Sequence, residues 1–126
     1  MTAPTLPETL ARLAQLLPSR VRGTGGYKWS TFYVSSSMFE AEAIWSAYDE
    51  KIDANPLRLH LLEFALREEC EARGWMWRVW AGLPGHGFGA EVERGVLTRP
   101  FEGMAEAPAH ALALAMISAL GGETTP

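Results

Sequence analysis

Apolar and polar residues follow two different periods along this chain. In four segments the apolar residues recur every three or four positions, which predicts helices with buried faces. These helices are expected at about residues 6–17, 38–52, 56–73 and 108–120. Between the last two helices, apolar and polar side chains alternate at every second position. This alternation predicts a β-hairpin at about residues 75–93.

Residues near the helix ends support these assignments. Residues 37–40 (SMFE) have the Ser-x-x-Glu form of a capping box, which satisfies backbone N–H groups at the start of a helix. Residues 55–56 (NP) are a start signal for the third helix, and Gly74 is placed to end it in a left-handed conformation. Cys70 lies on the apolar stripe of that helix, so we expect its thiol to be buried and inert.

The predicted hairpin holds three of the five tryptophans and a turn rich in Gly and Pro. The alternation of its first strand places Trp75, Trp77 and Val79 on one face and Met76, Arg78 and Trp80 on the other. We expect the face of Trp75 and Trp77, with Phe88 and Val92 from the returning strand, to cover the helices. Trp80, near the turn, is the tryptophan expected to be exposed.

The other face of the hairpin is expected to be polar. Arg78 lies on it and is expected to pair with Glu91 or Glu93 across the strands.

Two further segments have strand character. Residues 27–34 (YKWSTFYV) are aromatic and β-branched, which favours a strand. Residues 23–26 (GTGG) before it are interpreted as a flexible connector, because a phosphate-binding loop would need a preceding strand and a following Lys-Ser/Thr pair. A short strand is expected at residues 96–98, followed by a loop with Pro100 and Gly103 as breakers.

These elements together predict an α+β fold. The 126 residues fit a single domain, with short disordered tails at residues 1–4 and 122–126. A small antiparallel sheet built on the hairpin would pack with the four helices, and residues 27–34 are a candidate further strand of that sheet.

Composition and charge narrow the function classes. The formal net charge is −4 and no basic cluster is present, so nucleic-acid binding is not expected. The single cysteine excludes an internal disulfide and a thiolate zinc site within one chain. The start, MTAPTLPETL, lacks the basic and apolar run of a secretory signal, and the longest apolar stretch, residues 107–120, is too short to span a bilayer. We therefore expect a protein of the cytoplasm that has no membrane segment.

Few residues of the chain are candidates for catalysis or metal binding. His60, His86 and His110 lie on three separate predicted elements and share no ligand spacing, so no catalytic residue, metal or cofactor is expected. One alternative is a small enzyme that uses His86, Glu91 and Glu93, which are close in sequence around the hairpin.

The later half of the chain resembles the "ABA sandwich" family of small bacteriophage proteins. The resemblance covers roughly residues 70–120. It is carried by a helix ending in Gly74 and Trp75, a Trp-rich strand, a second strand with Phe88 and Glu91, and residues 104–108 (MAEAP) leading into the Ala- and Leu-rich helix to Leu120. The family implies an α/β sandwich and a phage or prophage gene, and it supplies no known activity or catalytic residues.

A second resemblance concerns topology alone. The order helix, three strands, helix is similar to that of double-stranded-RNA-binding domains, which grip phosphates with Lys residues at the start of their last helix. The corresponding residues here, 107–110 (APAH), contain no Lys. A nucleic-acid-binding module of this topology is a further alternative, and it would need a continuous basic patch formed by Arg20, Arg22, Lys28 and Arg78.

The leading hypothesis is a noncatalytic small phage-type protein that binds a host or phage macromolecule. A protein partner is expected, with inhibition of a host polymerase, nuclease or defence system as examples of the action. Aromatic residues commonly anchor interfaces, and Trp29, Tyr33, Trp80 and His86 are the candidate partner-binding residues. Exposed aromatic strand edges also favour a homodimer.

Overall fold

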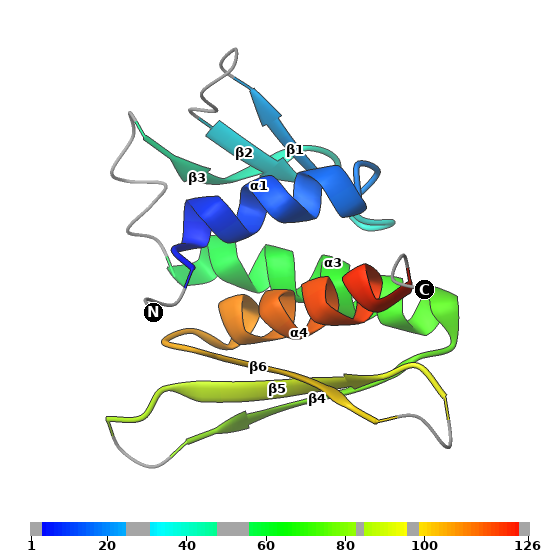
Figure 1. Ribbon diagram of the computed structural model, residues 1–126. Helices are drawn as coiled ribbons and strands as arrows, with labels where there is room; N and C mark the ends of the chain where they lie inside the picture. The colour runs from blue at the N-terminus through cyan, green and yellow to red at the C-terminus, as the bar shows by residue number, and fades with distance from the viewer. Residues whose placement is uncertain (1–3, 25–30, 48–55, 83–84, 96–98, 124–126) are drawn as a thin grey trace. The chain divides into compact units, whose positions relative to one another are not determined.

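The computed structural model describes residues 4–24, 31–47, 56–82, 85–95 and 99–123. The chain divides into two compact units, residues 1–65 and 66–126, and each unit holds one three-stranded antiparallel sheet (Figure 1). The described residues form three helices: α1 (Leu6–Leu16), α3 (Pro56–Arg73) and α4 (Pro108–Glu123). None of these helices has the length and apolar character that a bilayer-spanning segment needs.

The first unit begins with α1, whose start is fixed by its first residues. The Thr5 hydroxyl accepts a hydrogen bond from the Glu8 N–H (3.3 Å), and the Glu8 carboxylate accepts one from the Thr5 N–H (3.0 Å). This reciprocal pair is a capping box. Leu10 and Leu13 are fully buried, which confirms the apolar face predicted for this helix.

The sheet of the first unit has the order β1-β2-β3, and α1 packs against β1. Its strands are β1 (Val21–Thr24), β2 (Thr31–Val34) and β3 (Glu42–Ser46). The strand predicted here is confirmed for residues 31–34, where Phe32 and Val34 are buried whereas Thr31 and Tyr33 are partly exposed. Residues 25–30, the rest of that predicted segment and of the predicted connector, lie outside the described residues.

The interpretation of Gly23 and Thr24 as a flexible connector is wrong. Both residues belong to β1, where Gly23 pairs with Phe32 and Thr24 with Thr31. The glycines suggested a loop locally, but Val21 is buried and paired with Val34. Pairing and burial outweigh local propensity in sheets, so the segment joins the ladder.

The helix predicted at residues 38–52 is also wrong over its described part. Residues 42–46 form β3, which pairs with β2 across a bulge between Phe32 and Tyr33. The capping box expected at residues 37–40 does not form. The hydroxyls of Ser36 and Ser35 instead accept the N–H groups of Met38 and Ala41, both at 3.0 Å.

These serine contacts explain why a loop replaces the helix start. Ser side chains can offer backbone N–H groups a partner outside helical structure. Ala41, with φ of 42°, then turns the chain into β3, where Ile44 is buried. The remainder of the predicted helix, residues 48–52, lies outside the described residues.

Helix α3 ends as the sequence predicts. Gly74 has φ of 72°, its N–H donates to the Glu71 carbonyl, and the Trp75 N–H donates to the Cys70 carbonyl at 2.8 Å. This pair of bonds is the Schellman arrangement, which a left-handed glycine permits. The chain thereby turns directly from α3 into the hairpin.

The sheet of the second unit has the order β4-β5-β6. Its strands are β4 (Met76–Ala81), β5 (Phe88–Glu93) and β6 (Phe101–Ala105). The predicted hairpin is confirmed, with Trp77 opposite Val92 and Ala81 opposite Phe88. The third strand lies at residues 101–105, in a segment expected to be a loop, while the strand expected at residues 96–98 falls outside the described residues.

One sheet was expected, with residues 27–34 as a candidate strand beside the hairpin, and the structure has two sheets instead. Strand β2 pairs with β1 on one side and β3 on the other, so neither of its edges is left for the hairpin. The coarser α+β prediction is confirmed.

Helix α4 covers the inner face of the second sheet and packs against β5 and β6 (Figure 1). Gly103 of β6 faces this helix: a β-carbon there would lie 2.7 Å from the Ala115 nitrogen and 2.8 Å from Leu114 Cβ. The helix continues through Gly121 and Gly122 to Glu123, three residues past its predicted end. Buried residues of the second unit include Leu66, Cys70, Ala90, Val92, Leu112 and Met116.

Candidate functional site

The four candidate partner-binding residues divide between the two units. Tyr33 lies on β2 in the first unit and is partly exposed. Trp80 lies on β4 and His86 in the β4–β5 turn, both in the second unit, and both are exposed. Trp29 lies outside the described residues. The second unit therefore offers the better-defined candidate surface.

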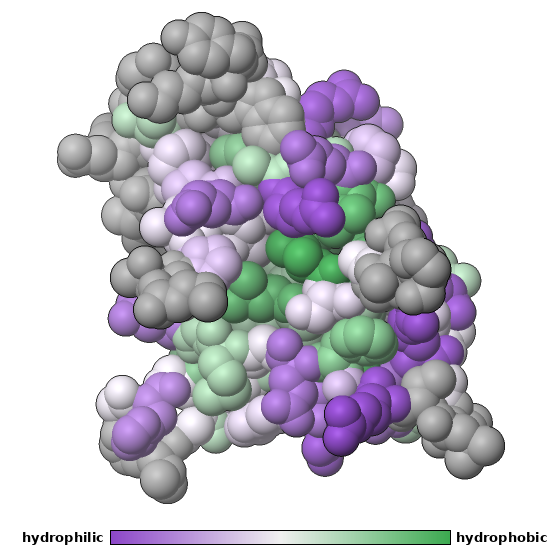
Figure 2. Space-filling view, viewed as in Figure 1, coloured by the Kyte–Doolittle hydropathy of each residue, from purple (hydrophilic) through white to green (hydrophobic). Residues whose placement is uncertain are grey.

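That surface is the face of the β4–β6 sheet that points away from α4, here called the outer face. The strand register arranges its side chains in three rows across the strands. The rows are Met76 and Glu93; Arg78, Glu91 and Glu102; and Trp80, Gly89 and Met104. Figure 2 shows hydrophilic and apolar residues side by side over the strands at the bottom of the view.

Large apolar side chains are exposed at both ends of the outer face. Met76 is 67% exposed, Trp80 37% and Met104 53%. Trp75, by contrast, is buried, and Trp77 is partly buried with the Arg67 guanidinium 4.4 Å from its ring centre. The prediction that Trp80 is the exposed tryptophan of the hairpin is confirmed.

The Trp80 indole lies over Gly89 of the neighbouring strand. A β-carbon at Gly89 would lie 2.6 Å from Trp80 Nε1, so the indole occupies the space that a side chain would otherwise take. The Arg78 guanidinium lies 5.6 Å from the centre of the Trp80 ring, within cation–π range. The indole thus has neighbours on its own sheet while Trp80 remains 37% exposed.

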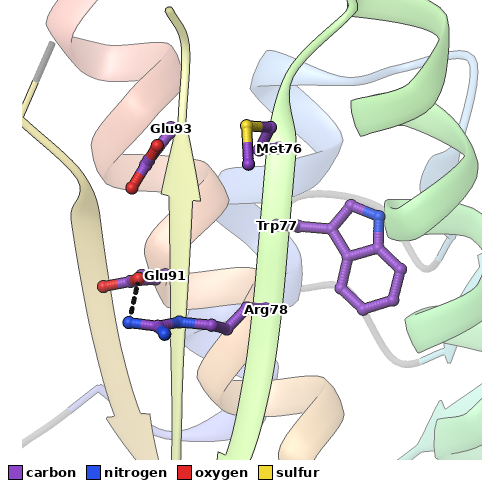
Figure 3. A pocket seen from close by; sticks show the side chains of 5 residues that line it. All are labelled: Met76, Trp77, Arg78, Glu91 and Glu93. Atoms are coloured by element: carbon purple, nitrogen blue, oxygen red, sulfur yellow. Dashed lines mark ion pairs between the residues drawn. The ribbon is translucent and has the colours of Figure 1, made fainter. Parts of the chain in front are cut away.

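Arg78 also covers an acidic side chain in the middle of the face. Arg78 Nη2 lies 2.5 Å from Glu91 Oε1, and Arg78 is largely exposed whereas Glu91 is buried. Figure 3 shows Arg78 reaching across to Glu91 while Trp77 points to the other side of β4. The predicted cross-strand pair is confirmed, with Glu91 rather than Glu93. A shallow hollow of about 210 Å³ lies here, lined by Met76, Trp77, Arg78, Glu91 and Glu93 (Figure 3).

The groups proposed for an enzyme do not converge. Glu93 is the last residue of β5, whereas His86 lies in the turn before its first residue. At about 3.4 Å per residue, the two ends of this six-residue strand are roughly 17 Å apart. Glu91 is engaged with Arg78. In the part of the chain that the structure describes, no three His, Cys, Asp or Glu residues gather as a metal site would require.

The basic patch required for nucleic-acid binding is not assembled in the second unit. Arg78 contributes to it only as the partner of Glu91, on a face that also carries Glu93 and Glu102. Arg20 and Arg22 belong to the first unit, and Lys28 lies outside the described residues.

Sequence reasoning missed two residues of the outer face. Met76 was placed on the correct side of β4 but not recognised as exposed, and Met104 fell in a segment expected to be a loop. The alternation of Phe101, Gly103 and Ala105 with Glu102 and Met104 was the signal for β6. It was obscured because Gly103 was interpreted as a strand breaker.

A smaller apolar site in the first unit was also missed. Met38 is 76% exposed in the loop before β3, and next to it Phe39 contacts Phe64 of α3, with ring centres 6.1 Å apart. Both Phe39 and Met38 were expected in a helix, which would have arranged them differently.

Comparison with known protein families, with curated proteins and with solved structures finds no match to this chain.

Proposed function

We propose that this chain is a noncatalytic protein that acts by binding another protein, and that the outer face of the β4–β6 sheet is its contact surface. The observation that carries the proposal is the exposure of Met76, Trp80 and Met104 on one face of one sheet. Exposed apolar side chains gathered on one face are characteristic of interaction sites, because their burial releases roughly 25 cal/mol per Å².

The central side chains of this face already contact one another. The Trp80 indole lies over Gly89 and close to Arg78, and Arg78 pairs with Glu91. A partner would therefore immobilise few additional side chains of this face. The entropy cost of binding is then smaller than for a surface whose side chains make no such contacts. Trp and Arg are also the residues most often found at the energetic centres of interfaces. Met76 and Met104, at the margins, can adapt their shape to a partner.

The proposal includes the phage or prophage origin that the family resemblance implies. A small noncatalytic phage protein that acts inside a host cell does so by occupying a surface of a host or phage protein. Inhibition of a polymerase, a nuclease or a defence component is the kind of action that this implies. His86, exposed in the turn next to β4, would lie at the border of such an interface.

Affinity capture with surface variants tests this proposal. The tagged chain is incubated with lysate of its source cell, beside a Met76→Ser/Met104→Ser double variant. Both side chains are mostly exposed, so their replacement leaves the core intact. We expect the wild type to recover one protein in stoichiometric amount and the double variant to recover about tenfold less, as for loss of interface anchors.

Met38→Ser is the control, because it removes a methionine of the first unit that is more exposed than Met76 or Met104. It should recover as much partner as the wild type. Equal recovery by the wild type and the double variant would reject the outer face as the contact surface. Sedimentation of the purified chain measures its oligomeric state. If the wild type is a dimer and the double variant a monomer, the outer face binds a second copy of this chain.

A further inference from the structure

The outer face carries an excess of negative charge. Its charged side chains are Arg78, Glu91, Glu93 and Glu102, one positive and three negative. The Arg78–Glu91 ion pair leaves Glu93 and Glu102 as the two carboxylates around it. Glu102 is exposed and Glu93 partly so.

Two arginines border the sheet outside the three rows of the outer face. Arg94 Nη1 donates to the Ala119 carbonyl of α4 at 3.2 Å, and its guanidinium lies 5.3 Å from the Phe101 ring centre. Arg99 lines a second hollow together with Glu102 and with Ser118 of α4. Among the side chains of the three outer-face rows, three carboxylates still accompany the single Arg78, so the face keeps its acidic character.

We infer that the partner presents an amphipathic helix whose apolar side chains cover Trp80 and Met104 and whose Lys or Arg side chains face Glu102 and Glu93. The inference rests on the proposed function and adds the chemistry of the partner. Opposite charges across an interface set its register and accelerate association. An exposed indole with a flanking methionine is the complement of apolar anchors on a helix.

The spacing of the rows fits a helix that lies along the strands. Adjacent rows are two residues apart, which is about 6.8 Å at 3.4 Å per residue. Residues four apart on a helix are separated by about 6 Å along its axis. A helix with an apolar residue over the Trp80 row can thus carry a basic residue one turn further along the same face, over Glu102, and a second basic residue after another turn, near Glu93.

The negative charge of the outer face also argues against three other partners: a nucleic acid, an anionic lipid surface and a second copy of this chain. A nucleic acid or an anionic lipid surface would bring phosphates against Glu93 and Glu102. A second copy of this chain that docked with the same face would oppose two surfaces of the same sign, which is unfavourable. A cationic apolar helix is the occupant that satisfies both the charge and the exposed methionines.

Two synthetic peptides test the inference with the full chain. Both are helices of about 20 residues, long enough to be helical in water, with identical Leu positions. One carries Lys and the other Glu at every polar position. Binding is measured by anisotropy of the labelled peptides, with the wild-type chain, with Glu93→Gln/Glu102→Gln, and with Glu40→Gln/Glu71→Gln. The last variant removes two carboxylates from elsewhere in the chain and so matches the change in net charge.

The Lys peptide should bind the wild-type chain at least about tenfold more tightly than the Glu peptide, and added salt should weaken it. Glu93→Gln/Glu102→Gln should reduce its affinity about fivefold to tenfold, since two exposed pairs are lost. Glu40→Gln/Glu71→Gln should change it less than about twofold. Met76→Ser/Met104→Ser should also weaken binding, because the peptide's apolar side chains lose their contacts.

Other outcomes distinguish the proposed binding surface from the inferred cationic, helical partner. If the Glu peptide binds as well as the Lys peptide, and Met76→Ser/Met104→Ser weakens both, the surface is retained and the inferred charge of the partner is rejected. If both carboxylate variants weaken the Lys peptide equally, binding follows net charge and the inference is rejected. If the Lys peptide binds but the methionine variant has no effect, the contact lies elsewhere and the proposed function fails with the inference. Absence of binding by both peptides rejects the helical cationic partner.

Discussion

Burial changes the titration of two side chains in the second unit. Desolvation raises the pKa of Cys70 to about 12, so its thiol stays protonated at neutral pH. Its Sγ lies 3.2 Å from Met116 Sδ in the core. The burial of the thiol expected from the helical stripe is confirmed, and its raised pKa agrees with the low reactivity expected of it. Desolvation likewise lowers the pKa of His110 below 6.5, and the charge of Glu106 opposes this effect only in part.

His110 should therefore make the stability of the chain depend on pH. Because its pKa is lower in the folded than in the unfolded protein, the unfolded chain binds more protons between the two values. The contribution is fully present above pH 6.5 and is lost as the pH falls through the lower folded pKa. The unfolding free energy of the wild type, from urea titrations between pH 7.5 and 5, should fall more steeply than that of His110→Gln.

The exposed His60 provides the matched variant, since His60→Gln removes an imidazole from the surface of α3. Identical slopes for the wild type and His110→Gln would show that burial of His110 does not control this pH dependence.

Single residues were predicted well where one local rule decides the outcome. Gly74 ends α3 because a left-handed position favours glycine, and Arg78 meets Glu91 because period-two alternation places both on one face. Exposure was harder to predict. Met76 and Met104 are apolar residues on a solvent-facing side, and no local rule distinguishes them from core methionines such as Met116.

At the scale of elements, the contact between β6 and α4 depends on a missing side chain. A β-carbon on Gly103 would come too close to backbone atoms of α4, which cannot move as a flexible side chain would. We predict that Gly103→Ala lowers the unfolding free energy by about 1–3 kcal/mol, the usual cost of overpacking. Urea-induced unfolding followed by circular dichroism measures this change.

Gly121, within α4, is the control glycine. A β-carbon there meets nothing within 4 Å, so Gly121→Ala should be neutral or stabilise the protein by up to about 1 kcal/mol through helix propensity. Equal effects of the two substitutions would contradict the close packing of β6 on α4.

Helices and strands were predictable where the hydrophobic period and the cap or turn residues indicate the same structure. They were less predictable where these two signals disagree. Helices α1 and α3 and the β4–β5 hairpin combine a clear period with caps or turn glycines. Residues 37–46 carry a helix-start motif, yet the Ser hydroxyls bind loop N–H groups and the segment pairs with β2. Such pairing depends on residues distant in sequence, which a local motif does not report.

At the scale of the whole molecule, the number of sheets could not be derived from the sequence. Alternation identifies which residues of a strand share a face, but it does not specify the neighbouring strand. Here strands adjacent in sequence pair, β2 with β1 and β3, and β5 with β4 and β6, so two sheets form. The outer face arises from the second sheet alone, since its three rows require all three strands. The sequence placed Met76, Arg78 and Trp80 on one face of β4 with Glu91 and Glu93 opposite, and β6 adds Glu102 and Met104.

The most direct test of the outer face as the binding surface is methionine oxidation, measured by mass spectrometry with and without the captured partner. In the free chain, hydrogen peroxide should oxidise Met38, Met76 and Met104, which are 76%, 67% and 53% exposed, and spare Met116, which is 0% exposed. Partner binding should protect Met76 and Met104 and leave Met38 reactive. Protection of Met38 with unchanged oxidation of Met76 and Met104 would contradict the assignment of the outer face as the binding surface.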